Sequence, residues 1–97
     1  ELMTRSGEWM AVKTPPGVLI CDTGDMMQHL TAGRMPSTTH RVVNPEGGSD
    51  GGRYSLPFFV HPNPDYVLTP IEPSYGKPIR SHDFLMQRLA EIGLVGK

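Results

Sequence analysis

His40 lies in a segment whose residue types could support metal chemistry. Residues Ser37–Val43 are rich in β-branched side chains, which favour a strand. The two-residue period of a strand would place His40 on the same face as Thr38 and Val42. A neutral imidazole there could ligate Fe(II), which proteins often hold with two histidines and one carboxylate. A lone histidine on a strand is also a common structural residue, so this segment alone leaves both interpretations open.

Arg53 and Ser55 form a second pair with chemical potential. In an extended segment their side chains project to the same side, and Phe59 follows on that side. A guanidinium can bind a carboxylate through two parallel hydrogen bonds, and the serine hydroxyl adds a third donor. The pair could therefore receive the carboxylate of a small molecule. Ordinary surface strands carry the same pair, so this motif also needs its context.

Short extended runs and turns must position these residues in the first half of the chain. Residues Glu1–Arg5 and Glu8–Lys13 flank a Ser-Gly turn, which predicts a hairpin. The continuous apolar run Gly17–Cys21 predicts a strand buried on both faces. Cys21 would then be an inert core residue.

Two helices are expected. Asp25, with Gln28 three residues later, predicts the N-cap and capping box of a short helix that ends near Gly33. Ser81 is the expected N-cap of a second helix, which ends near Gly93. The apolar stripe of that second helix consists of Leu85, Leu89 and Ile92.

The remaining strands are expected in the second half of the chain. A Gly-rich loop, Asn44–Gly52, separates Ser37–Val43 from the alternating segment Arg53–Val60. A last short strand is expected over Tyr66–Ile71, before a Pro-rich linker. The sum is an antiparallel β structure with one C-terminal helix, which indicates a jelly-roll or barrel.

The composition narrows the classes of partner. The chain has 97 residues, at most one small domain, and a net charge of −1. That charge gives no reason to expect nucleic acid or an anionic membrane as a partner. One cysteine cannot form an internal disulfide, which favours a reducing, cytoplasmic setting. No apolar stretch has the length of a transmembrane helix.

The ordered set of motifs resembles a known family. Thr39-His40-Arg41-Val42, the Gly-rich loop and then residues 53–59 (Arg-Tyr-Ser-Leu-Pro-Phe-Phe) are similar to the C-terminal half of the isopenicillin N synthase-like oxygenases. The Gly-Glu-Trp hairpin at 7–9, the Gly-Asp turn at 24–25 and Pro-Asn-Pro-Asp at 62–65 are also similar to that family. The resemblance covers roughly residues 1–70.

The resemblance implies a fold and a set of roles. Residues 1–72 would be the C-terminal part of a double-stranded β-helix, and residues 73–97 a linker and C-terminal helix. His40 would be the distal histidine ligand of Fe(II), and Arg53 and Ser55 would hold the distal carboxylate of 2-oxoglutarate. Phe59 would border the substrate. The implied reaction oxidises a small organic substrate and releases succinate and CO2.

One departure from the family pattern is large. The family's other two iron ligands form a His-x-Asp motif on an earlier strand, and no His-x-Asp occurs in this sequence. We therefore expect those ligands upstream in a longer polypeptide. Three alternatives stay open: a 2-oxoglutarate-independent oxidase of the isopenicillin N synthase type, a metal-free β-barrel binding module, and a structural fragment that is merely the ordered part of a longer chain.

Overall fold

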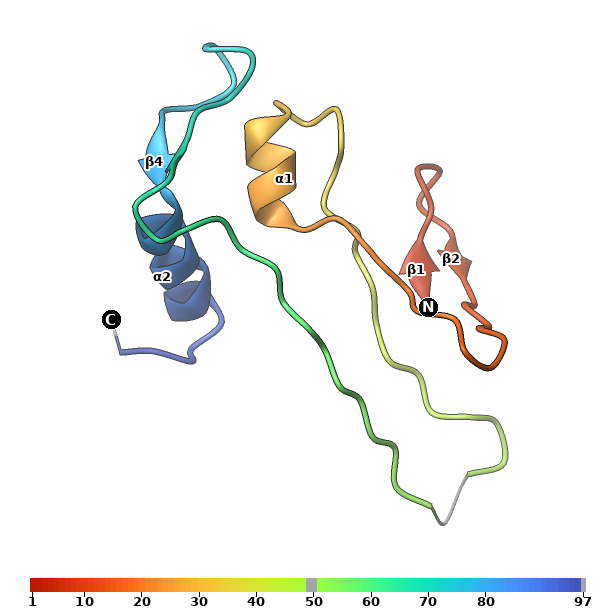
Figure 1. The fold of residues 1–97 in the computed structure, drawn as a ribbon. Coiled ribbons are helices and arrows are strands. Elements are labelled where there is room, and N and C mark those ends of the chain that lie inside the picture. Colours follow the sequence, from red (N-terminus) through yellow and green to blue (C-terminus); the bar gives the residue numbers. More distant parts are fainter. Residues whose placement is uncertain (49–50, 97) are drawn as a thin grey trace. The chain divides into compact units, whose positions relative to one another are not determined.

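The computed structural model describes residues 1–48 and 51–96, which form two compact units (Figure 1). The first unit contains residues 1–22 and 38–58, and the second contains residues 23–37 and 59–96. The elements follow one another in the order β1, β2, α1, β3, β4, α2. Short antiparallel strands and a C-terminal helix are therefore present, as the sequence predicted.

The first unit begins with a hairpin. β1 (Leu2–Met3) pairs with β2 (Trp9–Met10), so that Leu2 faces Met10 and Met3 faces Trp9. Gly7 in the turn has φ +85°, a conformation that glycine adopts without a steric penalty. The predicted hairpin is confirmed, with strands shorter than expected.

A third extended segment lies along the other edge of β1. The Met3 amide donates to the Thr39 carbonyl (2.8 Å), and the Arg41 amide donates to the Glu1 carbonyl (2.9 Å). An antiparallel bridge joins Leu2 and His40. The predicted strand Ser37–Val43 is thus wrong in extent, because only the residues beside β1 find a hydrogen-bonding partner.

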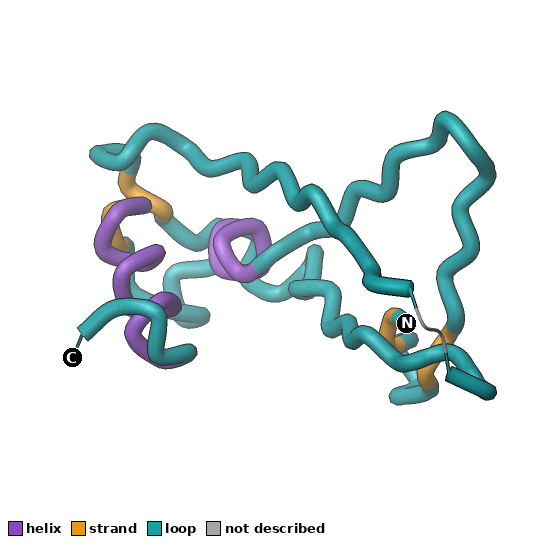
Figure 2. Tube along the Cα trace, turned by 90° about the horizontal axis from the view of Figure 1, so that it is seen from below, coloured by secondary structure: helices purple, strands orange, loops and turns teal. Residues whose placement is uncertain are grey.

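Two predicted strands are not formed. In Gly17–Cys21 the first residue lies in a turn with φ +80°, and the rest of this run, like Arg53–Val60, is loop, drawn in teal in Figure 2. Leu19 is 90% exposed and Leu56 is 98% exposed. Their β-propensity is real, but a ladder needs a neighbouring strand to complete its hydrogen bonds, and the described residues supply none to these runs.

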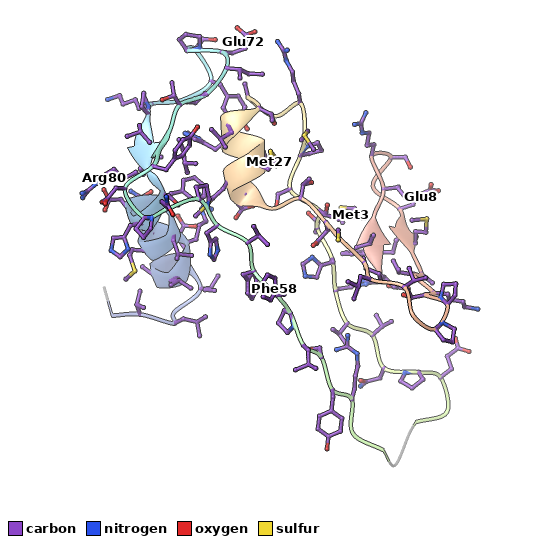
Figure 3. All side chains as sticks on the ribbon, viewed as in Figure 1. Met3, Glu8, Met27, Phe58, Glu72 and Arg80 are labelled. Atoms are coloured by element: carbon purple, nitrogen blue, oxygen red, sulfur yellow. The ribbon has the colours of Figure 1, made fainter. Side chains whose placement is uncertain are left out.

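The expected burial of Cys21 is also wrong. Cys21 is exposed, because the run that contains it has no sheet to cover it. Phe58, labelled in Figure 3, lies on the extended segment and is 90% exposed. An apolar pattern indicates which side chains favour burial, but it does not supply the surface that buries them.

The second unit holds the two helices and the second strand pair. α1 spans Asp25–Leu30 and α2 spans Ser81–Glu91. β3 (Val67–Leu68) pairs antiparallel with β4 (Ile79–Arg80), so the strand expected over Tyr66–Ile71 is shorter.

A small core lies beneath α2. Leu68 is fully buried, and Phe84 is 8% exposed. The Ile71 amide donates to the Leu30 carbonyl (3.0 Å), which ties α1 to the chain after β3. The hydroxyl of Ser81, itself buried, lies 3.7 Å from the sulfur of Met26 on α1.

Both helices have their N-cap one residue earlier than the sequence predicted. The N-cap positions are Gly24 and Arg80, so Asp25 and Ser81 are the first helical residues and provide no side-chain cap. Asp83 in the first turn of α2 hydrogen-bonds to the Arg80 guanidinium and raises the pKa of Arg80 above its ordinary value. At the other end of α1 the predicted turn is confirmed, since Gly33 has φ +79° and its amide donates to the Gln28 carbonyl.

Within the described residues, neither helix has the length and apolar character needed to cross a lipid bilayer.

The burial of Leu68 generates a stability prediction. Leu68→Ala should lower the free energy of unfolding by about 2–5 kcal/mol, because it removes buried methyl groups and leaves a cavity. Urea unfolding of the full-length protein measures this loss. Leu94→Ala is the matched control, since Leu94 is 71% exposed, and it should cost less than about 0.5 kcal/mol. Equal losses for the two variants would contradict a core centred on Leu68.

Candidate functional site

His40 is positioned by its pairing with β1. Residues directly opposite each other in an antiparallel pair project to the same face. His40 opposes Leu2, and Leu2 opposes Met10, so these three side chains share one face of the small sheet. The His40 side chain is 65% exposed there, which leaves it accessible to a ligand.

The hydrogen bonding of His40 determines which ring nitrogen is available. Nδ1 lies 3.0 Å from the Thr38 carbonyl oxygen, which can only accept, so Nδ1 carries the proton. The Asp22 carboxylate lies 3.7 Å from the same nitrogen. Nε2 then has a free lone pair, which is the arrangement of a histidine that ligates a metal.

The described residues fit one metal ligand and not a whole metal site. Across residues 1–48 and 51–96, no group of three or more His, Cys, Asp or Glu side chains could hold a metal ion. His40 fits Fe(II) by its tautomer and exposure, and any further ligands would come from outside these residues.

Arg41 fixes the strand from the opposite face. Its guanidinium lies 2.7 Å from the Glu1 carboxylate and 4.0 Å from the centroid of the Trp9 ring. An ion pair and a cation–π contact together hold this side chain in one orientation. Because neighbouring strand residues point to opposite faces, an anchored Arg41 keeps His40 on its own face. Sequence reasoning missed this role, although Arg41 directly follows His40 and Trp9 lies in the predicted hairpin.

Arg53 lies at an open pocket beside the strand that carries His40. The pocket has a volume of about 280 Å³. It is lined by Glu1, Ala11, Val12, Arg41, Val42, Val43 and Arg53. Arg41 is held by Glu1 and Trp9, so Arg53 is the lining arginine whose guanidinium could bind a small anion there.

The other two predicted residues are placed differently. Ser55 is exposed and does not line this pocket. Phe59 belongs to the second unit, where its ring stacks on that of His61 at a centroid distance of 6.2 Å. The structure thus brings Arg53 next to the residues that follow His40, whereas Ser55 does not line the pocket.

A second pocket lies in the other unit, and polar side chains of its lining contact other residues of that unit. It measures about 180 Å³. It is lined by Asp25, Gln28, His29, Tyr75, Phe84 and Arg88. The His29 Nε2 hydrogen-bonds to the Lys77 carbonyl (3.1 Å), and the Arg88 guanidinium of α2 lies 4.0 Å from the Asp25 carboxylate of α1. Its polar groups therefore serve packing between the helices and the loop that precedes β4.

Comparison with known proteins agrees with the family resemblance of the sequence motifs. The sequence model of the 2OG-Fe(II) oxygenase superfamily matches residues 1–62. The sexual differentiation process protein isp7 of Schizosaccharomyces pombe is 44% identical over 80 residues, which cover 79% of this chain and 19% of that protein. A 2-oxoglutarate-Fe(II) type oxidoreductase of Aspergillus fumigatus is 39% identical over 77 residues, which cover 77% of this chain and 22% of that protein.

A plant relative extends the same pattern. The homoarginine-6-hydroxylase 2-ODD-233 of Oryza sativa subsp. japonica is 39% identical over 72 residues, which cover 74% of this chain and 21% of that protein. The chain thus spans about a fifth of the length of these curated relatives. No solved structure gives a significant match.

The contacts of Arg41 generate a prediction for the first unit. Arg41→Ala should lower the free energy of unfolding by about 1–2 kcal/mol, since it removes a cation–π contact and a partly exposed ion pair. A double-mutant cycle with Trp9→Leu should give a coupling of about 0.5–1 kcal/mol.

Arg34→Ala is the matched control for that cycle. Arg34 makes an exposed ion pair with Glu72 (2.8 Å) and has no ring contact, so its loss should stay below about 1 kcal/mol. A coupling energy of zero between Arg41 and Trp9 would show that the cation–π contact does not stabilise this strand.

Proposed function

Because this chain belongs to the 2OG-Fe(II) oxygenase superfamily, we propose that it provides one iron ligand and the 2-oxoglutarate carboxylate receptor of an oxygenase. The observation that carries the proposal is the imidazole of His40, whose Nδ1 donates to the Thr38 carbonyl and leaves Nε2 free. The whole reaction would oxidise a small organic substrate and convert 2-oxoglutarate into succinate and CO2.

His40 would hold Fe(II) through Nε2. The remaining ligands, a His-x-Asp pair, would come from an upstream part of the same polypeptide, because this sequence contains no such pair. Bound Fe(II) supplies the activation of O2 that these side chains have no means to provide. The protein's contribution is to orient the ligand, to place the co-substrate and to exclude water from the site.

Arg53 would bind the distal carboxylate of 2-oxoglutarate, with Ser55 as a further donor. The position and the chemistry of Arg53 support this role. Arg53 lines the pocket beside the strand of His40, and a guanidinium fork matches a carboxylate. The serine would join it when residues 53–60 form a strand, since Arg53 and Ser55 then project to one side.

The fold that would create this strand is a double-stranded β-helix over residues 1–72, followed by a linker and the C-terminal helix over residues 73–97. The support is the exposure of the large apolar side chains of residues 54–60, which a neighbouring strand and a facing sheet would cover. In that arrangement Phe59 would lie on the side of Ser55 and border the substrate.

The iron site generates the first functional prediction. Anaerobic titration of the full-length protein with Fe(II) and then 2-oxoglutarate should produce a visible metal-to-ligand charge-transfer band. His40→Ala should abolish the band, whereas His82→Ala, at an exposed histidine of α2, should leave it unchanged. Iron binding without the band would move the assignment to a 2-oxoglutarate-independent oxidase. Absence of iron binding would favour a metal-free binding module.

The proposed carboxylate receptor, Arg53 with Ser55, generates the second functional prediction. Arg53→Ala should weaken 2-oxoglutarate binding by about 1.5–3 kcal/mol, because a charged hydrogen bond is lost. That is roughly 10- to 150-fold in the dissociation constant. Arg53→Lys should restore part of the affinity, since lysine keeps the charge but not the fork. Arg5→Ala, at an exposed arginine of the hairpin turn, is the control. Unchanged affinity in Arg53→Ala would refute the assignment.

A further inference from the structure

We propose that Asp22 is a positioning residue for His40, whose carboxylate holds the imidazole in the tautomer and orientation that present Nε2 to the metal. The inference rests on the proposed function and goes further, because neither the motif nor the family match assigns a role to Asp22. The observation that supports the inference is the position of the Asp22 carboxylate beside the Nδ1 atom of His40.

Two acceptors face the same nitrogen of His40. The Thr38 carbonyl oxygen lies 3.0 Å from Nδ1, and the Asp22 Oδ2 lies 3.7 Å from it. The carbonyl takes the hydrogen bond, and the carboxylate adds a negative charge on the side where the ring carries its proton. Moving the proton to Nε2 would place an Nδ1 lone pair against both oxygens, so the pair of acceptors disfavours that tautomer.

Asp22 is placed to support the ligand and not to replace it. The two ring nitrogens point to different sides of the imidazole, and the carboxylate approaches on the Nδ1 side. A metal on Nε2 would lie on the other side of the ring. Carboxylates that contact the second nitrogen of a ligating histidine fix its orientation and raise its basicity. Within the described part of the chain, the Asp22 carboxylate forms no salt bridge with an arginine or lysine, and the group it approaches is the neutral ring of His40.

The fold brings this carboxylate to the ring from a distant part of the sequence. Asp22 is the last residue of the first segment of its unit, and Thr38 begins the second segment. The two segments therefore meet at the His40 ring. Asp22 and His40 are 45% and 65% exposed, so water screens the charge in the free chain. Exclusion of water around a bound metal would strengthen the interaction.

The test measures metal binding without turnover. Dissociation constants for Fe(II) are determined anaerobically, without 2-oxoglutarate, for the full-length protein and its variants. Asp22→Ala should weaken Fe(II) binding by about 10- to 100-fold, as loss of such a partner does. Asp22→Asn keeps the shape and an acceptor but loses the charge, so it should fall between wild type and Asp22→Ala. Glu46→Gln, at an exposed carboxylate of the same unit, is the matched control and should match wild type.

A second readout separates positioning from a general effect on folding. Long-range proton–nitrogen NMR correlations of the His40 ring, assigned by their loss in His40→Ala, report its tautomer in the metal-free protein. Wild type should show the proton on Nδ1, and Asp22→Ala should show a mixture of both tautomers, with an unchanged unfolding midpoint.

The outcomes distinguish this inference from the function on which it rests. If wild type binds no Fe(II), or if His40→Ala binds it equally well, the proposed function fails, and the role of Asp22 fails with it. If His40→Ala abolishes binding while Asp22→Ala and Asp22→Asn bind as wild type with an unchanged tautomer, the function stands and the role of Asp22 is refuted.

Discussion

The antiparallel pairing of residues 39–41 with β1 is the constraint on which the candidate site depends. Two backbone hydrogen bonds, from Met3 to Thr39 and from Arg41 to Glu1, set the register of this segment. Because the side-chain period of a strand is two, a slip of one residue would exchange the faces of His40 and Arg41. The imidazole would then point to the side of Trp9, and the guanidinium would take its place. Register, more than the identity of any one residue, therefore determines which group can meet a metal.

The two faces of this small sheet carry different kinds of interaction, and each supports the other. On one face Arg41 contacts Glu1 and Trp9, and these contacts resist rotation of the strand. On the other face the Nδ1 atom of His40 lies close to the Thr38 carbonyl and to the Asp22 carboxylate. None of these contacts is strong alone, because exposed ion pairs contribute little in water. Together they restrict one side chain to one orientation, which is what a metal ligand needs.

Sequence analysis succeeded where a few neighbouring residues contain the whole signal. The Ser-Gly turn of the hairpin, the left-handed Gly33 and the short helix before it all depend on local backbone geometry. It failed for Arg53–Val60, since a strand exists only where a second strand completes its hydrogen bonds. Among the candidate site residues, His40 and Arg53 were singled out by an ordered motif. Asp22 was not, because its relation to His40 arises when two separate segments meet, and no local pattern marks it.

Under the proposed function, the extended segment after the Gly-rich loop would link the fold to the co-substrate. Leu56 and Phe58 are more exposed than apolar residues of their size normally are, and they alternate with Arg53 and Ser55. A sheet that covers the apolar side would turn the guanidinium and the hydroxyl together to the opposite side. One event, the pairing of this segment, would then bury the hydrophobic side chains and complete the carboxylate receptor. The energy that forms the receptor would come from burial of the apolar side chains that alternate with Arg53 and Ser55, which leaves the polar groups free to bind a ligand.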